Sequence, residues 1–275
     1  MNIYELSQEY LNLGYSDADV ASKVSQDIIL LKIGKSRYAK NITIKGGVVM
    51  HNISKDLRRA TRDMDLDFIK YSLEDESIYN FINELNKVDD GIEISIDSVP
   101  EKLHHQDYDG KRIYIFLKDI YGESIRTKLD IGVHKYFDMV QDEYSFDFNI
   151  LGESVSLLIN SNEQIIVEKL KSLLKFGITS TRFKDIFDFY YLINNQKINK
   201  KKLLKYINLL IYQDDTITQN SYEDLMKRLT GILNSNQYKT RLNNANSNWL
   251  DIPTDEVIDN VIEYFESLDN TEIHN

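Results

Sequence analysis

Three aspartates occupy every second position of the segment RDMDLDF, residues 62–68: Asp63, Asp65 and Asp67. Alternate residues of a β-strand point to opposite faces, so a strand here would bury its apolar residues and place all three carboxylates on the other face. Carboxylates on one face would stand about 6.5–7 Å apart and repel one another unless a positive charge lies between them. A divalent cation with oxygen ligands, most commonly Mg²⁺, meets that need. The segment therefore indicates a metal site, and a strand with a solvated acidic face is the other interpretation.

A pair of glycines precedes this segment. Lys45, Gly46 and Gly47 follow the apolar stretch ITI and precede VVMHNIS, which is predicted to form a short helix. A strand–Gly-Gly–helix corner presents bare backbone N–H groups at a helix N-terminus, where phosphate binds well. Taken alone, such a glycine pair usually marks a tight turn. A phosphate-cradling turn followed by a short helix and a D-x-D strand is the arrangement by which nucleotidyltransferases hold a nucleoside triphosphate.

Asp130, in the segment RTKLDIGV, is the best candidate for a third carboxylate. Its two neighbours are apolar, so Asp130 would lie on the polar face of its own strand. We expect Asp63, Asp65 and Asp130 to bind the metal. Asp65 and Asp67 are the alternative pair of metal ligands, and a surface aspartate is the alternative interpretation of Asp130.

A lysine lies within the apolar stripe of the helix predicted for residues 162–175. At 100° per residue, Lys169 falls among the apolar side chains of this helix, whereas Lys171 and Lys175 are expected to face outward. A lysine in such a stripe often extends its ammonium group to water. The functional interpretation is that Lys169 contacts the triphosphate of a bound nucleotide.

The next predicted helix contains the segment RFKDIFD, in which Asp185 and Asp188 share one side at a spacing of three residues. This pair could orient Lys169, accept a proton from an acceptor hydroxyl, or simply solvate the helix. Arg182 and Lys184 beside the pair would suit phosphate contacts.

The elements that must position these residues change in character near residue 160. Before it, helices alternate with stretches of period two, which predict strands. These stretches are residues 42–47, 63–70, 91–99, 112–117, 124–133, 146–150 and 154–159. Beyond it the pattern is helical, with helices expected near residues 162–175, 181–194, 198–212, 222–234 and 254–268. The sequence therefore predicts an α+β fold in which an α/β part, residues 1–160, precedes an all-α part, residues 161–275.

Composition limits the class of protein. The chain has 275 residues, a net charge of −11 and no cysteine, so thiolate metal sites and disulfides are excluded. The N-terminus lacks the features of a secretory signal and no apolar run suggests a membrane span, so we expect a cytoplasmic protein. The acidic total argues against a general polyanion binder. Basic residues nevertheless cluster in residues 32–40, 168–184 and 197–205, which leaves a nucleic-acid substrate open.

These motifs together resemble the AbiEii-type nucleotidyltransferases, which are the toxin halves of bacterial abortive-infection, type IV toxin–antitoxin systems and have the mycobacterial MenT toxins as relatives. The family carries a Gly-Gly corner, an R-x-[ST]-x-D-x-D strand, a lysine-bearing helix and a helix with R-x-K-D-x-x-D. The corresponding residues here are Gly46-Gly47, Arg59 to Asp65 with Thr61 in the Ser/Thr position, Lys169 in EKLKSLL, and Arg182 to Asp188. The matches extend from about residue 42 to residue 192, and the LDIG around Asp130 is similar to a recurring family strand.

The resemblance implies a polymerase-β-like nucleotidyltransferase lobe with a mixed sheet and an all-α lobe that completes the active site. It implies transfer of a nucleotide from an NTP, with Mg²⁺ or Mn²⁺ as cofactor and GTP or CTP among the candidate substrates. In relatives the acceptor has been linked to the tRNA 3′ end, and nucleotide transfer to that end blocks growth in phage defence. A cognate antitoxin encoded nearby, with or without direct contact, is also implied.

The same resemblance assigns roles to residues by matched position. The catalytic residues would be Asp63, Asp65, Lys169 and Asp185. The nucleotide-binding residues would be Lys45, Gly46, Gly47, Arg59, Thr61, Arg182, Lys184 and Asp188. Asp67 departs from the family pattern as an additional acid. Two other functions stay open: nucleotidyl transfer to a protein or a small molecule, and a non-catalytic module that keeps the fold to bind a nucleotide or a partner.

Overall fold

The computed structural model describes residues 1–103, 110–136 and 138–268. The chain divides into two compact units, Met1–Asn160 and Ser161–Asn275. Within the described residues, no helix has both the length and the apolar character needed to cross a membrane.

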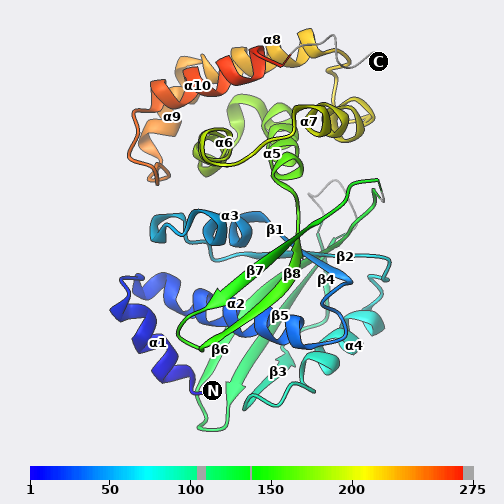
Figure 1. The fold of residues 1–275 in the computed structure, drawn as a ribbon, viewed down its shortest axis with the longest axis vertical. Helices are drawn as coiled ribbons and strands as arrows, with labels where there is room; N and C mark the ends of the chain where they lie inside the picture. The colour runs from blue at the N-terminus through cyan, green and yellow to red at the C-terminus, as the bar shows by residue number, and fades with distance from the viewer. Residues whose placement is uncertain (104–109, 137, 269–275) are drawn as a thin grey trace. The chain divides into compact units, whose positions relative to one another are not determined.

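The first unit is built on one mixed sheet with the strand order β3-β5-β6-β2-β1-β8-β7, and β4 pairs with β5 (Figure 1). The strands are β1 Ile42–Lys45, β2 Met64–Phe68, β3 Ile92–Ile96, β4 Glu101–Leu103, β5 Gly110–Asp119, β6 Ser124–Val133, β7 Asp142–Phe148 and β8 Glu153–Ile159. Two neighbouring pairs, β2 with β6 and β1 with β8, are parallel, and the other pairs are antiparallel. The expected α+β class with a mixed sheet is confirmed.

The helices of this unit are α1 Ile3–Asn12, α2 Asp17–Lys35, α3 Gly46–Ser54, the short 3₁₀ turn η1 Leu57–Arg59, and α4 Asp75–Leu85. α2 packs against β6 and β8, and α4 packs against β3. The approach of α2 to β8 is close enough that a Cβ atom on Gly34 would lie 2.5 Å from Val155. A larger residue than glycine would therefore push this helix off the sheet.

The apolar face of β2 is buried as the period-two pattern predicted. Met64, Leu66 and Phe68 are at most 2% exposed, and the Phe68 ring packs edge-on against Phe81 of α4, with ring centroids 5.3 Å apart. Burial of such side chains contributes about 1.5–3 kcal/mol each relative to leaving them exposed. This packing fixes which face of β2 carries the aspartates.

Several element boundaries differ from the sequence-based expectation. The glycine pair was expected within a strand over residues 42–47, but β1 ends at Lys45 and α3 begins directly at Gly46. β7 ends at Phe148, since the chain then turns through Gly152 with φ at +66°. Neither β4, of three residues, nor helix α9, Asn236–Asn244, was expected. α9 is largely polar and buries only Tyr238 and Leu242, so it has almost no apolar periodicity to detect.

The second unit is helical. Its elements are α5 Asn162–Phe176, the 3₁₀ turn η2 Gly177–Thr179, α6 Lys184–Asn195, α7 Lys200–Ile207, the π-helical turn η3 Asn208–Tyr212, α8 Tyr222–Leu233, α9 and α10 Thr254–Glu266. Ser161 caps α5 by accepting a hydrogen bond from the Gln164 amide at 3.4 Å. α5 contacts α6, α7 and α8, and α10 contacts α6, α8 and α9. α5 lies between α6 and α7 in Figure 1.

Candidate functional site

The glycine corner lies against the aspartate strand. Gly46, the first residue of α3, has φ at +68°, a conformation that L-residues with a side chain rarely adopt. A Cβ atom on Gly46 would overlap Asp65 Oδ2, and one on Gly47 would lie 2.6 Å from Thr61 Oγ1. Both positions therefore need glycine because the D-x-D segment approaches the helix N-terminus too closely for any side chain.

The register of the sheet explains this approach. Lys45 at the end of β1 pairs with Asp65 of β2, so the corner that follows Lys45 is level with the Asp65 carboxylate. On the other side of β2, Asp65 pairs with Asp130 of the parallel strand β6. Asp65 is half-buried between the two strands. One end of three neighbouring strands thus gathers the corner and two of the predicted acids.

Asp67 differs from the other acids of β2 because it is buried and paired. Only 4% of Asp67 is exposed, and its Oδ1 lies 2.7 Å from Nζ of Lys45, which is itself buried. Removing either member of such a pair is costly because the remaining charge stays in a medium that solvates it poorly. Lys45, predicted to bind nucleotide, is therefore engaged within the sheet in this structure.

Asp63 precedes β2 and is the most exposed of the three aspartates. Its side chain is 57% exposed and lies 2.7 Å from Nζ of Lys128 on β6. An ion pair with this much solvent access contributes little to stability. Asp63 and Asp65 are therefore the two acids of this segment that solvent reaches.

Asp130 is held by an arginine that no motif in the sequence indicates. Arg112 of β5, the register partner of Asp130, donates from Nε to Oδ1 and from Nη2 to Oδ2, both at 2.7 Å. The hydrogen bonds to Asp130 raise the pKa of Arg112 above its ordinary value. This two-bond fork is the strong form of an arginine–carboxylate contact. The negative charge of Asp130 is thus compensated by Arg112 within the sheet.

The acids fit a metal as a pair better than as a triad. Within the described residues, no group of three or more His, Cys, Asp and Glu side chains is arranged to hold a metal ion. Mg²⁺ is commonly bound by one or two carboxylates together with substrate phosphates and water. Asp63 and Asp65 would be the members of that smaller donor set. The metal-binding roles of Asp63, Asp65 and Asp130 stay predictions.

The second unit holds a compact ion cluster on α5 and α6. The Lys169 ammonium contacts Asp185 and lies 2.8 Å from Asp188 Oδ2. Lys169 is 11% exposed at its side chain, Asp185 15% and Asp188 not at all. Of the three roles considered for the aspartate pair, orienting Lys169 is the one for which the structure shows contacts.

Lys171 corrects one expectation from the helical wheel. It was expected to face outward, but it is 8% exposed and forms an ion pair with Asp214, which follows η3. Burial opposes ionisation of Asp214, but hydrogen bonds from Lys171 and Thr216 outweigh it and lower the pKa of this carboxyl to about 2. A wheel for α5 alone does not show that the chain after η3 returns to cover this side of the helix.

Three further predicted residues have different surroundings. Arg59 is 4% exposed at the end of η1, close enough to His51 for its charge to help lower the pKa of that imidazole. Arg182 is exposed just before α6, and its backbone carbonyl accepts a hydrogen bond from the Asp185 amide at 3.1 Å. Lys184 is the first residue of α6 and is half-buried. Arg182 and Lys184 thus precede the two aspartates at the N-terminal end of this helix.

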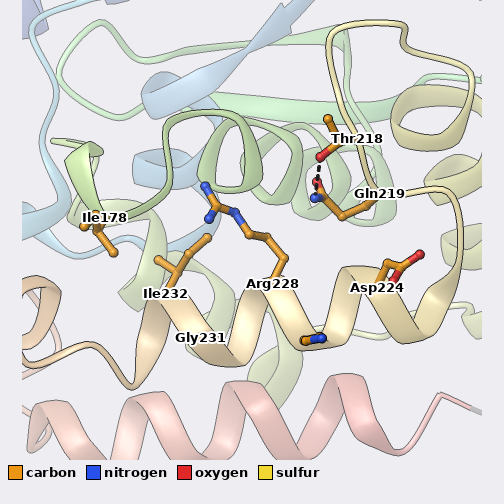
Figure 2. A pocket seen from close by; sticks show the side chains of 8 residues that line it. Ile178, Thr218, Gln219, Asp224, Arg228, Gly231 and Ile232 are labelled. Carbon is orange, nitrogen blue, oxygen red and sulfur yellow. Dashed lines mark hydrogen bonds between the residues drawn. The ribbon is translucent and has the colours of Figure 1, made fainter.

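A separate cavity of about 500 Å³ lies in the second unit. It is lined by Ile178, Thr218, Gln219, Asp224, Lys227, Arg228, Gly231 and Ile232. Figure 2 shows Arg228 extending from α8, and its guanidinium lies over Gly177, where a Cβ atom would come within 2.5 Å of Nη2. The one acid of this cavity, Asp224, accepts a hydrogen bond from Ser221 at 2.9 Å. None of the predicted site residues lines it, and it offers no carboxylate pair for a metal.

The comparison with protein families agrees with the motifs. A family model described as the nucleotidyl transferase AbiEii toxin of a type IV toxin–antitoxin system matches residues 28–260. A solved structure titled as that of an antigenic nucleotidyltransferase-like protein from Paracoccidioides brasiliensis is 18% identical, with a TM-score of 0.44, over 83% of this chain and 94% of that chain. No curated protein matches the sequence.

Proposed function

The chain belongs to the AbiEii nucleotidyl transferase toxin family of type IV toxin–antitoxin systems, and from this premise we propose that it transfers a nucleotide from an NTP to the 3′ end of an RNA, with tRNA as the acceptor class. Family membership makes it a nucleotidyltransferase and implies an antitoxin partner. The observation that carries the proposal is the contact between the Gly46 corner and the Asp65 carboxylate. It brings the backbone N–H groups of a helix N-terminus and a solvent-reached acid to one place, as phosphate and metal together require.

In the proposed reaction, a hydroxyl oxygen of the acceptor attacks the α-phosphorus of the NTP. The new P–O bond forms as the bond to the β-phosphate oxygen breaks, pyrophosphate leaves, and the hydroxyl proton passes to solvent or to a nearby base. Asp63 and Asp65 would hold Mg²⁺, which supplies charge neutralisation at the reacting phosphate. The α3 N-terminus at Gly46 and Gly47 would bind the phosphates.

Lys169 is proposed to bind the triphosphate. Asp185 and Asp188 hold its ammonium in one position, so little side-chain entropy is lost when the nucleotide binds. Asp185, the more exposed of the two, would be able to exchange its contact with Lys169 for one with the substrates. Arg182 and Lys184 at the start of α6 are proposed to contact phosphate groups.

The decisive experiment offers each α-labelled NTP with Mg²⁺ to the wild type and to Asp65→Ala, with total tRNA, total protein or candidate small molecules as acceptors in parallel reactions. We expect label in RNA with the wild type and none with the variant. Asp147→Ala, which removes an exposed acid from β7 of the same sheet, is the control and should label RNA normally. Label in protein or in a small molecule would favour the second enzymatic function, and binding of NTP without any transfer would favour the non-catalytic module.

The RNA acceptor has a separate test in the basic start of α7. Lys202 lies 3.1 Å from the buried acid Glu163, whereas Lys200 and Lys201 are exposed. We propose that Lys200 and Lys201 contact phosphates. The variant Lys200→Glu/Lys201→Glu should then bind RNA more weakly, and the slope of log binding constant against log salt concentration should fall by the equivalent of about two phosphate contacts. The control Lys102→Glu/Lys118→Glu changes charge equally in the first unit. Equal RNA binding by both variants would show that Lys200 and Lys201 are solvated and do not contact RNA.

A further inference from the structure

The segment that leads into β2 has little structure of its own. Residues 60–63, between η1 and β2, belong to no helix or strand, yet they carry Thr61 and Asp63. Buried backbone carbonyl groups need hydrogen-bond donors, and a segment outside helices and strands must find them elsewhere. Residues 60–63 are half-buried or exposed, so the donors that reach their carbonyl groups, together with the ion pair between Asp63 and Lys128, help to fix where Asp63 lies.

Gln26 in the middle of α2 supplies that donor. Its side-chain amide Nε2 lies 2.9 Å from the carbonyl oxygen of Thr61 and 3.5 Å from that of Asp63. Gln26 is 4% exposed, and α2 is buried from Val24 to Ile33. A buried amide on a helix packed against the sheet cannot follow a moving segment, so it must hold that segment in place.

A second contact between α2 and this segment is weaker. Arg62 Nε lies 2.9 Å from Asp19 Oδ1, but the Arg62 side chain is 62% exposed. Exposed pairs of this kind contribute about 0–1 kcal/mol. Gln26 is therefore the principal anchor between α2 and residues 60–63.

The anchored segment determines the geometry of the proposed site. Thr61 lies against Gly47, where a Cβ atom would come within 2.6 Å of Thr61 Oγ1, and two residues later the chain reaches Asp63. We propose that Gln26 is a positioning residue, which sets the distance of Asp63 and Thr61 from the glycine corner by holding their carbonyl groups. This inference rests on the proposed nucleotidyl transfer. Gln26 itself touches neither metal nor nucleotide.

Gln26→Met tests this role because methionine keeps the length of the side chain and loses the N–H donor. If Gln26 positions Asp63, kcat should fall roughly 10- to 100-fold, as expected when a reacting group is displaced by about 1 Å. The KM for NTP should change less than about twofold, because the phosphate-binding corner is intact. Gln26→Glu should lose more activity than Gln26→Met, since its carboxylate would face the Thr61 carbonyl. The matched control is Gln141→Met: Gln141 donates to the Met139 carbonyl at 2.8 Å in the same unit.

Hydrogen–deuterium exchange of the protein without metal or nucleotide gives a readout that does not depend on activity. In Gln26→Met, amides of residues 60–63 should exchange at least about tenfold faster, with the strands of the sheet unchanged. If wild-type protein transfers no nucleotide, the proposed function fails, and the exchange experiment still decides whether Gln26 holds this segment. Unchanged exchange at residues 60–63 would overturn the inference. So would faster exchange across the whole sheet, which would make Gln26 a packing residue.

Discussion

Gly46 and Asp65 are in such close contact that a methyl group on the glycine would overlap the carboxylate oxygen Oδ2. This contact joins the start of α3 to the start of β2 across the β1–β2 register. It makes two demands on residue 46, a left-handed backbone at φ +68° and the absence of a side chain. The two demands can be separated experimentally.

Gly46→Ala should reduce nucleotidyl transfer at least about tenfold, because its methyl group displaces Asp65. Gly152→Ala is the matched control: Gly152 has φ at +66°, and a Cβ atom there would have open space around it. Both variants should lose about 1–2 kcal/mol of unfolding free energy from backbone strain. Only Gly46→Ala should lose activity per folded molecule. Equal activity of the two variants would mean that the contact with Asp65 has no catalytic consequence.

Asp65→Asn and Asp67→Asn should have opposite consequences. Asp65→Asn should abolish transfer, by about 10³-fold or more, because an amide is a poorer ligand for a divalent cation than a carboxylate. Asp67→Asn should leave most activity per folded molecule but lower the unfolding free energy by roughly 3 kcal/mol, because Lys45 then stays buried without its partner. Urea denaturation and transfer assays on both proteins make the comparison. Loss of transfer in both variants would instead identify Asp65 and Asp67 as the metal ligands.

Lys169→Met and Lys171→Met compare two lysines of α5 that each pair with an acid of low exposure. Each variant leaves that acid without its cation, so both should be destabilised, by roughly 3 kcal/mol for Lys169 and less for the pair with the more accessible Asp214. If Lys169 binds the triphosphate, Lys169→Met should abolish transfer, while Lys171→Met should keep activity once corrected for the folded fraction. Similar losses of corrected activity in both would indicate that Lys169 acts through stability alone.

His51 of α3 should make stability depend on pH. Burial, followed by the charge of Lys23, lowers the pKa of His51 to about 4. Nδ1 is 3.1 Å from the Asp56 carbonyl, which can only accept, so Nδ1 carries the proton of the neutral ring and Nε2 accepts from the Tyr15 hydroxyl at 2.7 Å. Protonation of Nε2 would lose the hydrogen bond from Tyr15. The folded pKa lies below the unfolded value of about 6.5, so this contribution to stability is present above pH 6.5 and is lost as pH falls toward 4.

The measurement is urea denaturation of the wild type and His51→Gln at several values between pH 7.5 and pH 4.5. The wild type should be the more stable protein at pH 7.5, and its advantage should shrink by on the order of 2 kcal/mol toward pH 4.5. Parallel stability curves would show that His51 is not the group responsible.

The side of β2 that is buried was predictable because a strand turns alternate residues to opposite faces. Met64, Leu66 and Phe68 needed no further information to be placed in the core. The glycine corner and its helix were also visible in local sequence, with an error of two residues in where the strand ends. What local sequence does not contain is the register between strands. Arg112 and Asp130 are 18 residues apart and become partners only through the pairing of β5 with β6.

The sequence by itself determined the chemistry that this chain can offer: paired carboxylates, a glycine corner, and a lysine with two aspartates one helix later, in the order of a known family. The tertiary structure decided how each charge is compensated. Lys45, Lys128 and Arg112 reach the acidic face from three different strands. Lys171 of α5 forms an ion pair with Asp214, which follows η3. Electrostatic energy depends on distances of a few ångströms, and those distances arise only when segments far apart in the chain pack together.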